Sequence, residues 1–236
     1  MQAVILAAGD GGRLRPLTRH TPKPLIEVNG KPIIGHVLDA LSASDVRDAV
    51  IVLGYRGEQV RAALEATHAR GMRLRFVENE SFMLGNARSI WAARAAVDGP
   101  FLLMMSDHLV EPAMIRQLAD GADGMCRLAV ERADRDDARA GEATLAHVQD
   151  GMVVDLGKGI DVWNALDTGT FWCTPRVFDA MTPEMRDGEA GAVFATLARR
   201  GELAAVDVTG RLWCDVDTEV DLRRAAQLFG AHAGLA

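Results

Sequence analysis

The sequence predicts an α/β fold with a mostly parallel, doubly wound sheet and a small β-rich insertion in its second half. Two observations support this. Short β-branched runs alternate four times with amphipathic stretches in the first half of the chain, and a glycine-rich loop directly follows the first of these runs. Successive strand-then-helix units are typical of parallel sheets covered by helices on both faces. In such sheets, ligands bind at the carboxyl ends of the strands.

The expected elements follow in order along the chain. Strands are predicted at residues 3–6, 49–53, 74–77 and 101–105, and the helices after them at 33–41, 58–68, 87–96 and 112–118. After about residue 120 the Asp150-Gly151 turn between residues 143–148 and 152–156 predicts a hairpin. A strand at 171–172 and helices at 176–181, 192–199 and 218–231 complete the chain. Thr218 and Asp221 form a cap signature for the last helix.

Composition narrows the class of protein. The 236 residues are 49% hydrophobic and 25% charged, and no apolar run approaches the roughly 20 residues that span a membrane. The run at residues 4–8 is short and has no basic residue before it, so we expect a buried strand, no secretion signal and a cytoplasmic protein. Cys126, Cys173 and Cys214 lack a C-x-x-C pair, so we expect reduced core residues.

The net charge of −7 disfavours a general nucleic-acid binder, which needs a basic face. We therefore expect neither a nucleic acid nor a membrane as partner, whereas a homo-oligomeric state is left open. Any anionic ligand has to be held locally by a few Lys and Arg side chains. A divalent cation would offset the protein's own carboxylates there.

The glycine loop is the strongest candidate for such a site. Its glycines let backbone N–H groups approach an anion, which suits a triphosphate. A dinucleotide-binding loop would need a third glycine where Leu14 stands, and the P-loop pattern G-x-x-x-x-G-K-[ST] is absent. A tight turn with Arg13 and Lys23 on a solvated surface is the structural alternative. The loop reads Leu6-Ala7-Ala8-Gly9-Asp10-Gly11-Gly12-Arg13-Leu14-Arg15-Pro16-Leu17-Thr18 and leads to Pro22-Lys23-Pro24.

Three aspartates are candidate metal ligands. Asp107 follows the buried strand at 101–105, at the sheet edge where ligands bind. Asp215 and Asp217 share a face by strand alternation, and paired carboxylates suit a hard cation such as Mg²⁺. A turn or cap role is the alternative for Asp107 and for Asp217. His108 could touch a phosphate, but a lone histidine beside a functional aspartate is more often structural, and the six histidines lack metal-ligand spacing.

The loop closely resembles the signature G-x-G-x-R-L-x-P-L-T, followed by P-K-P, of the sugar-phosphate nucleotidyltransferase superfamily. The resemblance implies a Rossmann-like, GT-A-like fold in one domain, residues 1–236. It implies that Arg13 contacts the β- and γ-phosphates of a nucleoside triphosphate and that Lys23 contacts the α-phosphate. It also implies that Asp107, with Asp215 and Asp217, holds Mg²⁺, so that Arg13, Lys23 and Asp107 are the catalytic set. The loop residues implied to contact the nucleotide are Leu6, Ala7, Ala8, Gly9, Gly11 and Gly12.

Four further segments narrow the resemblance. The stretch with Asn79, Gly85, Asn86 and Ser89 is similar to cytidylyltransferases acting on inositol 1-phosphate or phosphocholine, in which Asn and backbone groups read the pyrimidine. A helix-capping role is the alternative for Asn86. The segment with Lys158 and the one with Asp167, Thr168 and Gly169 resemble the acceptor-binding segment of this superfamily. In that segment a lysine holds the acceptor phosphate and the D-T-G stretch faces the alcohol. The segment from residue 213 to 218 also resembles the inositol-phosphate branch.

The expected function is therefore a magnesium-dependent transfer of CMP from CTP to a small phosphorylated polyol, such as inositol 1-phosphate, with release of pyrophosphate. Residues 1–120 would form the nucleotide-binding half and 121–236 the acceptor-binding half. An ionised phosphate monoester attacks without a general base. The alternatives are an alkylphosphonate, phosphocholine or hexose 1-phosphate as acceptor, and a nucleotide-sensing regulatory subunit. An oxidoreductase on a dinucleotide fold is a distant third.

Overall fold

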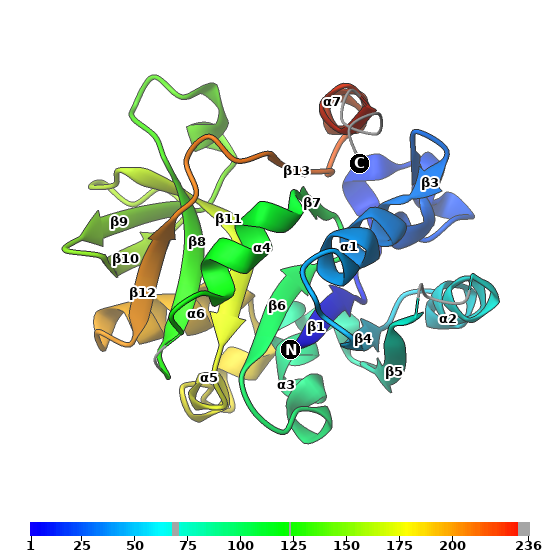
Figure 1. Cartoon of the computed structure of the whole chain (residues 1–236), viewed down its shortest axis with the longest axis horizontal. Coiled ribbons are helices and arrows are strands. Elements are labelled where there is room, and N and C mark those ends of the chain that lie inside the picture. The colour runs from blue at the N-terminus through cyan, green and yellow to red at the C-terminus, as the bar shows by residue number, and fades with distance from the viewer. Residues whose placement is uncertain (68–70, 123, 231–236) are drawn as a thin grey trace.

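The protein is built on one nine-stranded sheet, as a computed structural model that describes residues 1–67, 71–122 and 124–230 shows (Figure 1). The strand order is β5-β4-β1-β6-β11-β8-β12-β10-β9. In chain order these strands are β1 (Gln2–Ala7), β4 (Asp48–Leu53), β5 (Arg73–Glu78), β6 (Phe101–Met105), β8 (Cys126–Arg132), β9 (Leu145–Gln149), β10 (Met152–Gly157), β11 (Ala165–Cys173) and β12 (Leu203–Asp207).

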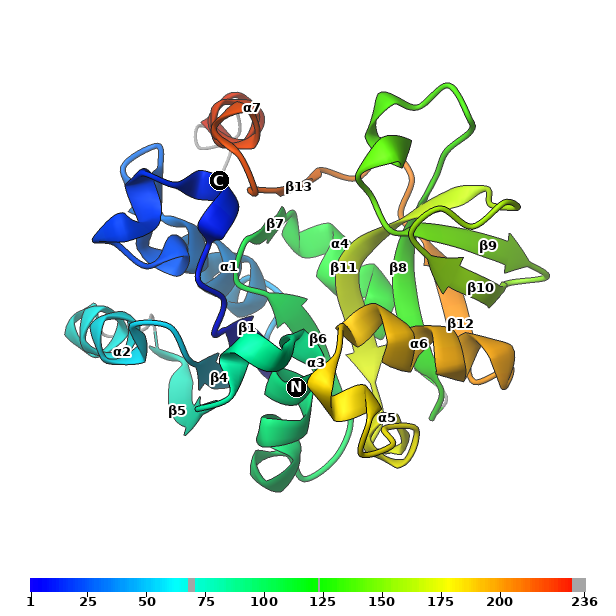
Figure 2. The ribbon, with the colours of Figure 1, turned by 180° about the vertical axis from the view of Figure 1, so that it is seen from behind.

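Helices cover both faces of the sheet. Figure 1 shows α1 and α4 in front of it, and Figure 2, from behind, shows α3 and α6. The strand residues alternate accordingly: Val4 and Leu6 pack with α3 and α6, whereas Ala3 and Ile5 pack with α1 and α4. The helices are α1 (Ile33–Ser42), α2 (Gly57–Ala66), α3 (Asn86–Ala92), α4 (Pro112–Ala119), α5 (Arg176–Asp179), α6 (Ala190–Arg199) and α7 (Glu219–Gly230).

The first four strands of the main sheet, β1, β4, β5 and β6, define its topological switch point, where the strand order reverses. β1 pairs in parallel with both β4 and β6, and β4 pairs in parallel with β5. The chain therefore moves outward from β1 to β4 and β5 and then returns to β6 on the other side of β1. Ligands bind outside the carboxyl ends of strands at such a reversal. The glycine loop and Asp107 follow β1 and β6 at this point.

The second half of the chain extends the same sheet. β11 joins β6 in antiparallel pairing and continues to β8, which pairs in parallel with β12. β10 and β11 are antiparallel to the other strands of the sheet. Because β9 pairs with β11 as well as with β10, this end of the sheet curls back on itself. The predicted hairpin is the β9–β10 pair. The predicted fold class is confirmed, with the β-rich part continuous with the main sheet.

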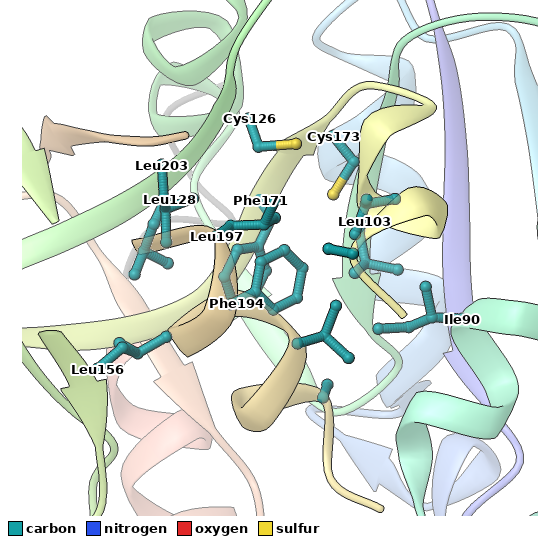
Figure 3. Packing of buried hydrophobic residues seen from close by; sticks show 14 of the residues in the cluster. Ile90, Leu103, Cys126, Leu128, Leu156, Phe171, Cys173, Phe194, Leu197 and Leu203 are labelled. Atoms are coloured by element: carbon teal, nitrogen blue, oxygen red, sulfur yellow. The ribbon is translucent and has the colours of Figure 1, made fainter. Parts of the chain in front are cut away.

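A hydrophobic cluster packs α6 against the strands of the second half (Figure 3). The rings of Phe171 on β11 and Phe194 on α6 stack with their centroids 3.8 Å apart. Burying a phenylalanine side chain contributes roughly 1.5–3 kcal/mol relative to exposing it. Cys126 and Cys173 lie in the same cluster as free, buried thiols, as the sequence predicts. This packing holds β11 firmly against α6.

Two small sheets lie beside the main one. β7 (His108–Val110) pairs with β13 (Trp213–Asp215), and β2 (Glu27–Val28) pairs with β3 (Lys31–Pro32). A third hydrophobic cluster, with Leu14, Leu109 and Val216 among its members, joins the glycine loop, β7 and the segment before α7. Figures 1 and 2 both show α7 beside the N-terminal loops. The last helix therefore lies beside the loops that follow β1, at the switch point.

Element boundaries differ from prediction in a few places. The predicted helix at 87–96 becomes a 3-10 turn (Ala93–Ala96) after Ala92, and α6 begins at Ala190, two residues before its predicted start. The cap of α7 is as predicted: the Thr218 amide donates to Asp221 Oδ2 at 2.8 Å. The predicted helix ends at 68 and 231 lie outside the described residues. Among the described helices, none combines the length and apolar character needed to cross a membrane.

Candidate active site

The glycine loop folds back onto the segment that carries Lys23. Gly11 has a φ of +63°, and a Cβ there would collide with the Lys23 side chain and with Thr18. The Thr18 hydroxyl donates a 2.9 Å hydrogen bond to the Gly11 carbonyl. Glycine is therefore required at position 11, both for its left-handed backbone and for the close approach of the lysine.

Lys23 lies between two aspartates from distant parts of the chain. Its ammonium group donates to Asp107 Oδ2 and, at 2.7 Å, to Asp217 Oδ1. The Lys23 side chain is only 10% exposed. Burial alone would lower the pKa of Lys23, but the charges and hydrogen bonds of Asp107 and Asp217 outweigh burial and raise it. Lys23 is therefore held as a buried cation at the switch point.

Arg13 shares Asp217 with Lys23. Its guanidinium lies 2.6 Å from Asp217 Oδ2, while 63% of its side chain is exposed. The two Asp217 oxygens are thus occupied by two different cations. Arg13 can exchange this carboxylate for an anion from solution with a small loss of free energy, because an ion pair of a largely exposed side chain contributes only about 0–1 kcal/mol.

His108 completes the pairing of Asp107. Its Nδ1 lies 2.8 Å from Asp107 Oδ1. Burial works to lower the pKa of His108, but the hydrogen bond and charge of Asp107 raise it. Burial works to raise the pKa of Asp107, but Lys23 and His108 hold it well below its ordinary value. The His108 ring also lies against Gly169, where a Cβ would collide with it. His108 therefore positions Asp107 and links β7 to β11.

The predicted carboxylates are only partly gathered. Asp107 and Asp217 meet at one ammonium group, whereas Asp215 lies opposite His108 in the β13–β7 pair. Within residues 1–67, 71–122 and 124–230, no three His, Cys, Asp or Glu side chains are arranged to hold a metal ion. Asp107 and Asp217 supply hard oxygen donors suited to Mg²⁺. They fit that ion only once Lys23 and Arg13 turn away from them.

The segment predicted to contact the base is tied to other elements. The Asn79 amide donates to the Ser89 hydroxyl at 2.9 Å, and both side chains are buried. The side-chain carbonyl of Asn86 accepts from the Ala190 amide at 2.5 Å and so caps α6. A Cβ at Gly85 would collide with the Gly188 carbonyl. These contacts tie the segment to α3 and α6, and Asn86 also lines the cleft between the two halves, so its role in contacting the nucleotide stays a prediction.

A cleft of about 870 Å³ joins the two halves of the chain. Arg13, His108, Lys158, Asp167 and Asp217 are among the residues that line it. Burial, opposed by the Gly169 amide that donates to its carboxylate, raises the pKa of Asp167 to about 6. Thr168 is fully buried, and its hydroxyl donates to the Ala129 carbonyl at 2.8 Å, so it joins β11 to β8. Lys158, Asp167 and Gly169 thus face the cleft, and Thr168 does not.

Several cleft residues are missing from the prediction. Arg139 pairs with Glu131 and with Asp137, each at 2.7 Å, and the Trp213 indole N–H donates to the same Glu131 oxygen at 2.6 Å. Arg139 and Trp213 line the cleft, as does Arg224 of α7. Arg139 and Arg224 lie in no recognisable motif, whereas Trp213 opens the segment from residue 213 to 218 that resembles the inositol-phosphate branch. The amphipathic pattern of α7, in which Asp221 and Arg224 share a face three residues apart, is the only sequence signal for Arg224.

Comparison with known proteins places the chain in a family. The sequence pattern of the nucleotidyl transferase family matches residues 2–230. The chain is 34% identical to a bifunctional IPC transferase and DIPP synthase of Rubrobacter xylanophilus, covering 96% of this chain and 51% of that protein. It is 30% identical to the CMP-5'-(3-aminopropyl)phosphonate synthase of Streptomyces rubellomurinus, covering 95% of this chain and 38% of that protein. The chain thus spans about half the length or less of these curated relatives.

A solved structure is also similar over the whole fold. The inositol-1-phosphate CTP transferase from T. maritima superposes with a TM-score of 0.87 at 27% identity, covering 100% of this chain and 97% of that one. The glycine loop, the buried lysine and the two aspartates occupy the switch point of that shared architecture. On the family match and these relatives, the chain belongs to the nucleotidyl transferase family.

Proposed function

We propose that the protein is a magnesium-dependent cytidylyltransferase, which transfers CMP from CTP to a small phosphorylated polyol such as inositol 1-phosphate and releases pyrophosphate. The observation that carries the proposal is the buried Lys23 held by Asp107 and Asp217 beside the glycine loop. The choice of cytidine and of a polyol rests on the relatives, because the T. maritima protein is named for CTP and inositol 1-phosphate.

Binding of the triphosphate is an exchange of partners. Each carboxylate oxygen of Asp107 and Asp217 has a cationic or imidazole partner. A triphosphate brings its own negative charge to Lys23 and Arg13, which can then leave the aspartates. The freed carboxylates would hold Mg²⁺, and the ion when bound would supply charge neutralisation on the phosphates. The net charge of the cluster is thereby kept close to balance throughout.

The chain's own residues then position the reacting groups. Lys23 would contact the α-phosphate and stabilise the charge that develops on its oxygens. Arg13 would hold the β- and γ-phosphates, which depart as pyrophosphate. The acceptor phosphate is mostly ionised near pH 7 and attacks in line, so no side chain need take a proton from it. In this proposal the half at 1–120 binds the nucleotide and the half at 121–236 the acceptor.

Asp167 and Lys158 would define the acceptor end of the cleft. Among the described residues, the Gly169 amide is the one donor to the Asp167 carboxylate, which so keeps acceptor capacity for a hydroxyl group of a polyol. Lys158 is exposed at the cleft and would attract the acceptor's negative charge. A small alkylphosphonate is the second candidate acceptor, since the Streptomyces relative is named for one. The cytoplasmic location stays a prediction.

A matrix of substrates tests the proposal. The four nucleoside triphosphates are each combined with inositol 1-phosphate, a hexose 1-phosphate, phosphocholine and 2-aminoethylphosphonate, with Mg²⁺, and pyrophosphate release is measured. We expect the highest rate with CTP and inositol 1-phosphate and its loss with EDTA. Turnover with another pair would replace the substrate assignment. Tight nucleotide binding without turnover in any pair would instead indicate a nucleotide-sensing regulatory subunit.

The Asp107→Asn variant tests the assigned metal role. It keeps the shape of the side chain but removes the charge that Mg²⁺ needs. We expect kcat to fall at least about a hundredfold. Asp48→Asn is the matched control, because Asp48 pairs with Arg73 away from the cleft. Unchanged turnover in Asp107→Asn would refute the metal role.

A further inference from the structure

The cations that line the cleft fall into two groups. Arg13 is paired with Asp217, and Arg139 is paired with Glu131 and Asp137. Lys158 and Arg224 also line the cleft, but neither forms a hydrogen bond or ion pair with the described residues. Positive charge that is free for an anion is therefore located at these two side chains.

Arg224 is held in place by the helix that carries it. α7 begins two residues after Asp217, and its first turn is fixed by Thr218 and Asp221. The opposite side of the helix packs into the cluster around Ala225. Asp221 and Arg224 share the face that lines the cleft. Arg224 is half-buried there, so its position is set by α7 and not by a protein partner.

The surroundings of Arg224 belong to the acceptor side. Its charge acts on Asp137, which precedes the 3-10 turn Ala138–Gly141 in the second half, and on Cys214 of β13. The triphosphate loop already has Arg13 and Lys23. A guanidinium presents a planar fork of donors that matches two oxygens of a phosphate or phosphonate. A half-buried guanidinium without a carboxylate partner is well suited to such a group.

We propose that Arg224 binds the anionic group of the acceptor, a phosphate monoester or phosphonate, and together with Lys158 fixes it for attack. This rests on the proposed function, since it names the residue that selects the acceptor of that same reaction. Because α7 begins next to Asp217, an arginine on this helix is held at a fixed distance from the triphosphate site. It sets the distance between the acceptor's anionic group and the residues that hold the α-phosphate.

The test compares two neighbouring arginines of α7. Arg224→Gln removes the charge in the cleft, and Arg224→Lys keeps the charge but loses the fork. Arg223→Gln is the matched control, because Arg223 is exposed and pairs with Glu219 at 3.9 Å. For each variant, KM is measured for inositol 1-phosphate and for CTP, with thermal melting as a check of folding.

We expect Arg224→Gln to raise the KM for inositol 1-phosphate roughly tenfold to a hundredfold, the usual effect of losing charge-assisted hydrogen bonds. The KM for CTP should change less than about twofold, Arg224→Lys should recover part of the loss, and Arg223→Gln should match the wild type. An unchanged KM for inositol 1-phosphate in Arg224→Gln would overturn the inference. So would an equal rise in both KM values, which would indicate a general structural role.

Binding measured by calorimetry separates this inference from the proposed function. Inositol 1-phosphate is titrated into each variant in the presence of Mg²⁺ and a non-hydrolysable CTP analogue. Loss of binding in Arg224→Gln but not in Arg223→Gln supports the inference even where the substrate matrix shows no turnover. Equal binding by both variants, or no binding by the wild type, overturns it. Absence of turnover alone bears on the proposed function only.

Discussion

The ammonium nitrogen of Lys23 lies 2.7 Å from a carboxylate oxygen of Asp217, a residue 194 positions further along the chain. The same nitrogen also contacts Asp107, so one cation holds together the glycine-loop segment, the end of β6 and the start of α7. The pairing has two roles. Together with Arg13 it offsets the charges of two carboxylates, and it keeps the lysine beside the loop proposed to receive the triphosphate.

Replacing Lys23 tests this relationship directly. Lys23→Met keeps an unbranched chain but leaves Asp107 and Asp217 without their shared cation. We expect kcat to fall roughly a hundredfold to a thousandfold, because a preorganised charge at the reacting phosphate is lost. Lys31→Met is the control, since Lys31 pairs with Asp39 outside the cleft. Steady-state pyrophosphate release measures both, and equal effects of the two variants would contradict the assigned role.

Asp167 should make stability depend on pH. Its pKa rises from the ordinary 3.8 to about 6 in the folded protein, so the folded state favours the protonated form. The stability that protonated Asp167 contributes is fully present below about pH 3.8 and is lost as pH rises through about 6. Asp167→Asn mimics the neutral form and should be more stable than the wild type at pH 8, by up to ~3 kcal/mol.

Chemical denaturation at several pH values measures this difference. It should be constant above about pH 7 and shrink from about pH 6 towards pH 4, while the acceptor KM of Asp167→Asn rises because the carboxylate is gone. Asp161→Asn, on an exposed aspartate outside the cleft, is the control for the loss of a carboxylate. A constant stability difference across this range would rule out a raised pKa for Asp167.

Gly169 and Gly159 form a matched pair for the link between β11 and His108. Both have a φ of +69°, so alanine is strained at either position, but only at Gly169 would the new Cβ collide with the His108 ring. Gly169→Ala should therefore displace His108 and the Asp107 that it positions. We expect kcat to fall about a hundredfold, as a displacement of about 1 Å commonly causes. Gly159→Ala should lose stability but keep kcat, and similar kcat values would show that His108 does not transmit the change.

Asn86 separates a structural role from recognition of the base. Asn86→Ala removes the cap of α6 and should cost about 1 kcal/mol of stability, measured by thermal or chemical unfolding. Asn86→Asp keeps the capping oxygen and loses the amide donor. If Asn86 only caps α6, Asn86→Asp should retain both stability and the KM for CTP. A raised KM for CTP at unchanged stability would instead assign the amide to the nucleotide.

The features that the sequence predicted well depend on local pattern. Strand and helix periods, the glycine loop and the position of Asp107 after a buried strand are visible within short windows, and each lies where expected. Asp217 was predicted as a ligand by spacing, and the structure brings it to Lys23. Local patterns suffice here because alternation and glycine placement act over a few residues.

The features that were missed depend on distant partners. Asn86 caps a helix that begins 104 positions later, and no local signal marks that contact. The pairing of Asp107 and Asp217 with Lys23 arises from how β7, β13 and α7 meet. Arg224 faces the cleft because of the rotation of α7 about its axis, which tertiary packing decides. Such contacts follow from the assembled fold and not from residue spacing.

The distance in sequence between Lys23 and Asp217 also affects how the protein matures on the ribosome. Synthesis at about 5–20 residues per second places the appearance of Asp217 ~10–40 s after that of Lys23. During that interval the sheet around β1, β4 and β5 can form, but the lysine lacks one of its two carboxylates and α7 does not yet cover the loop. The nascent chain can therefore form the sheet around β1, β4 and β5 before it acquires a site able to capture a nucleotide.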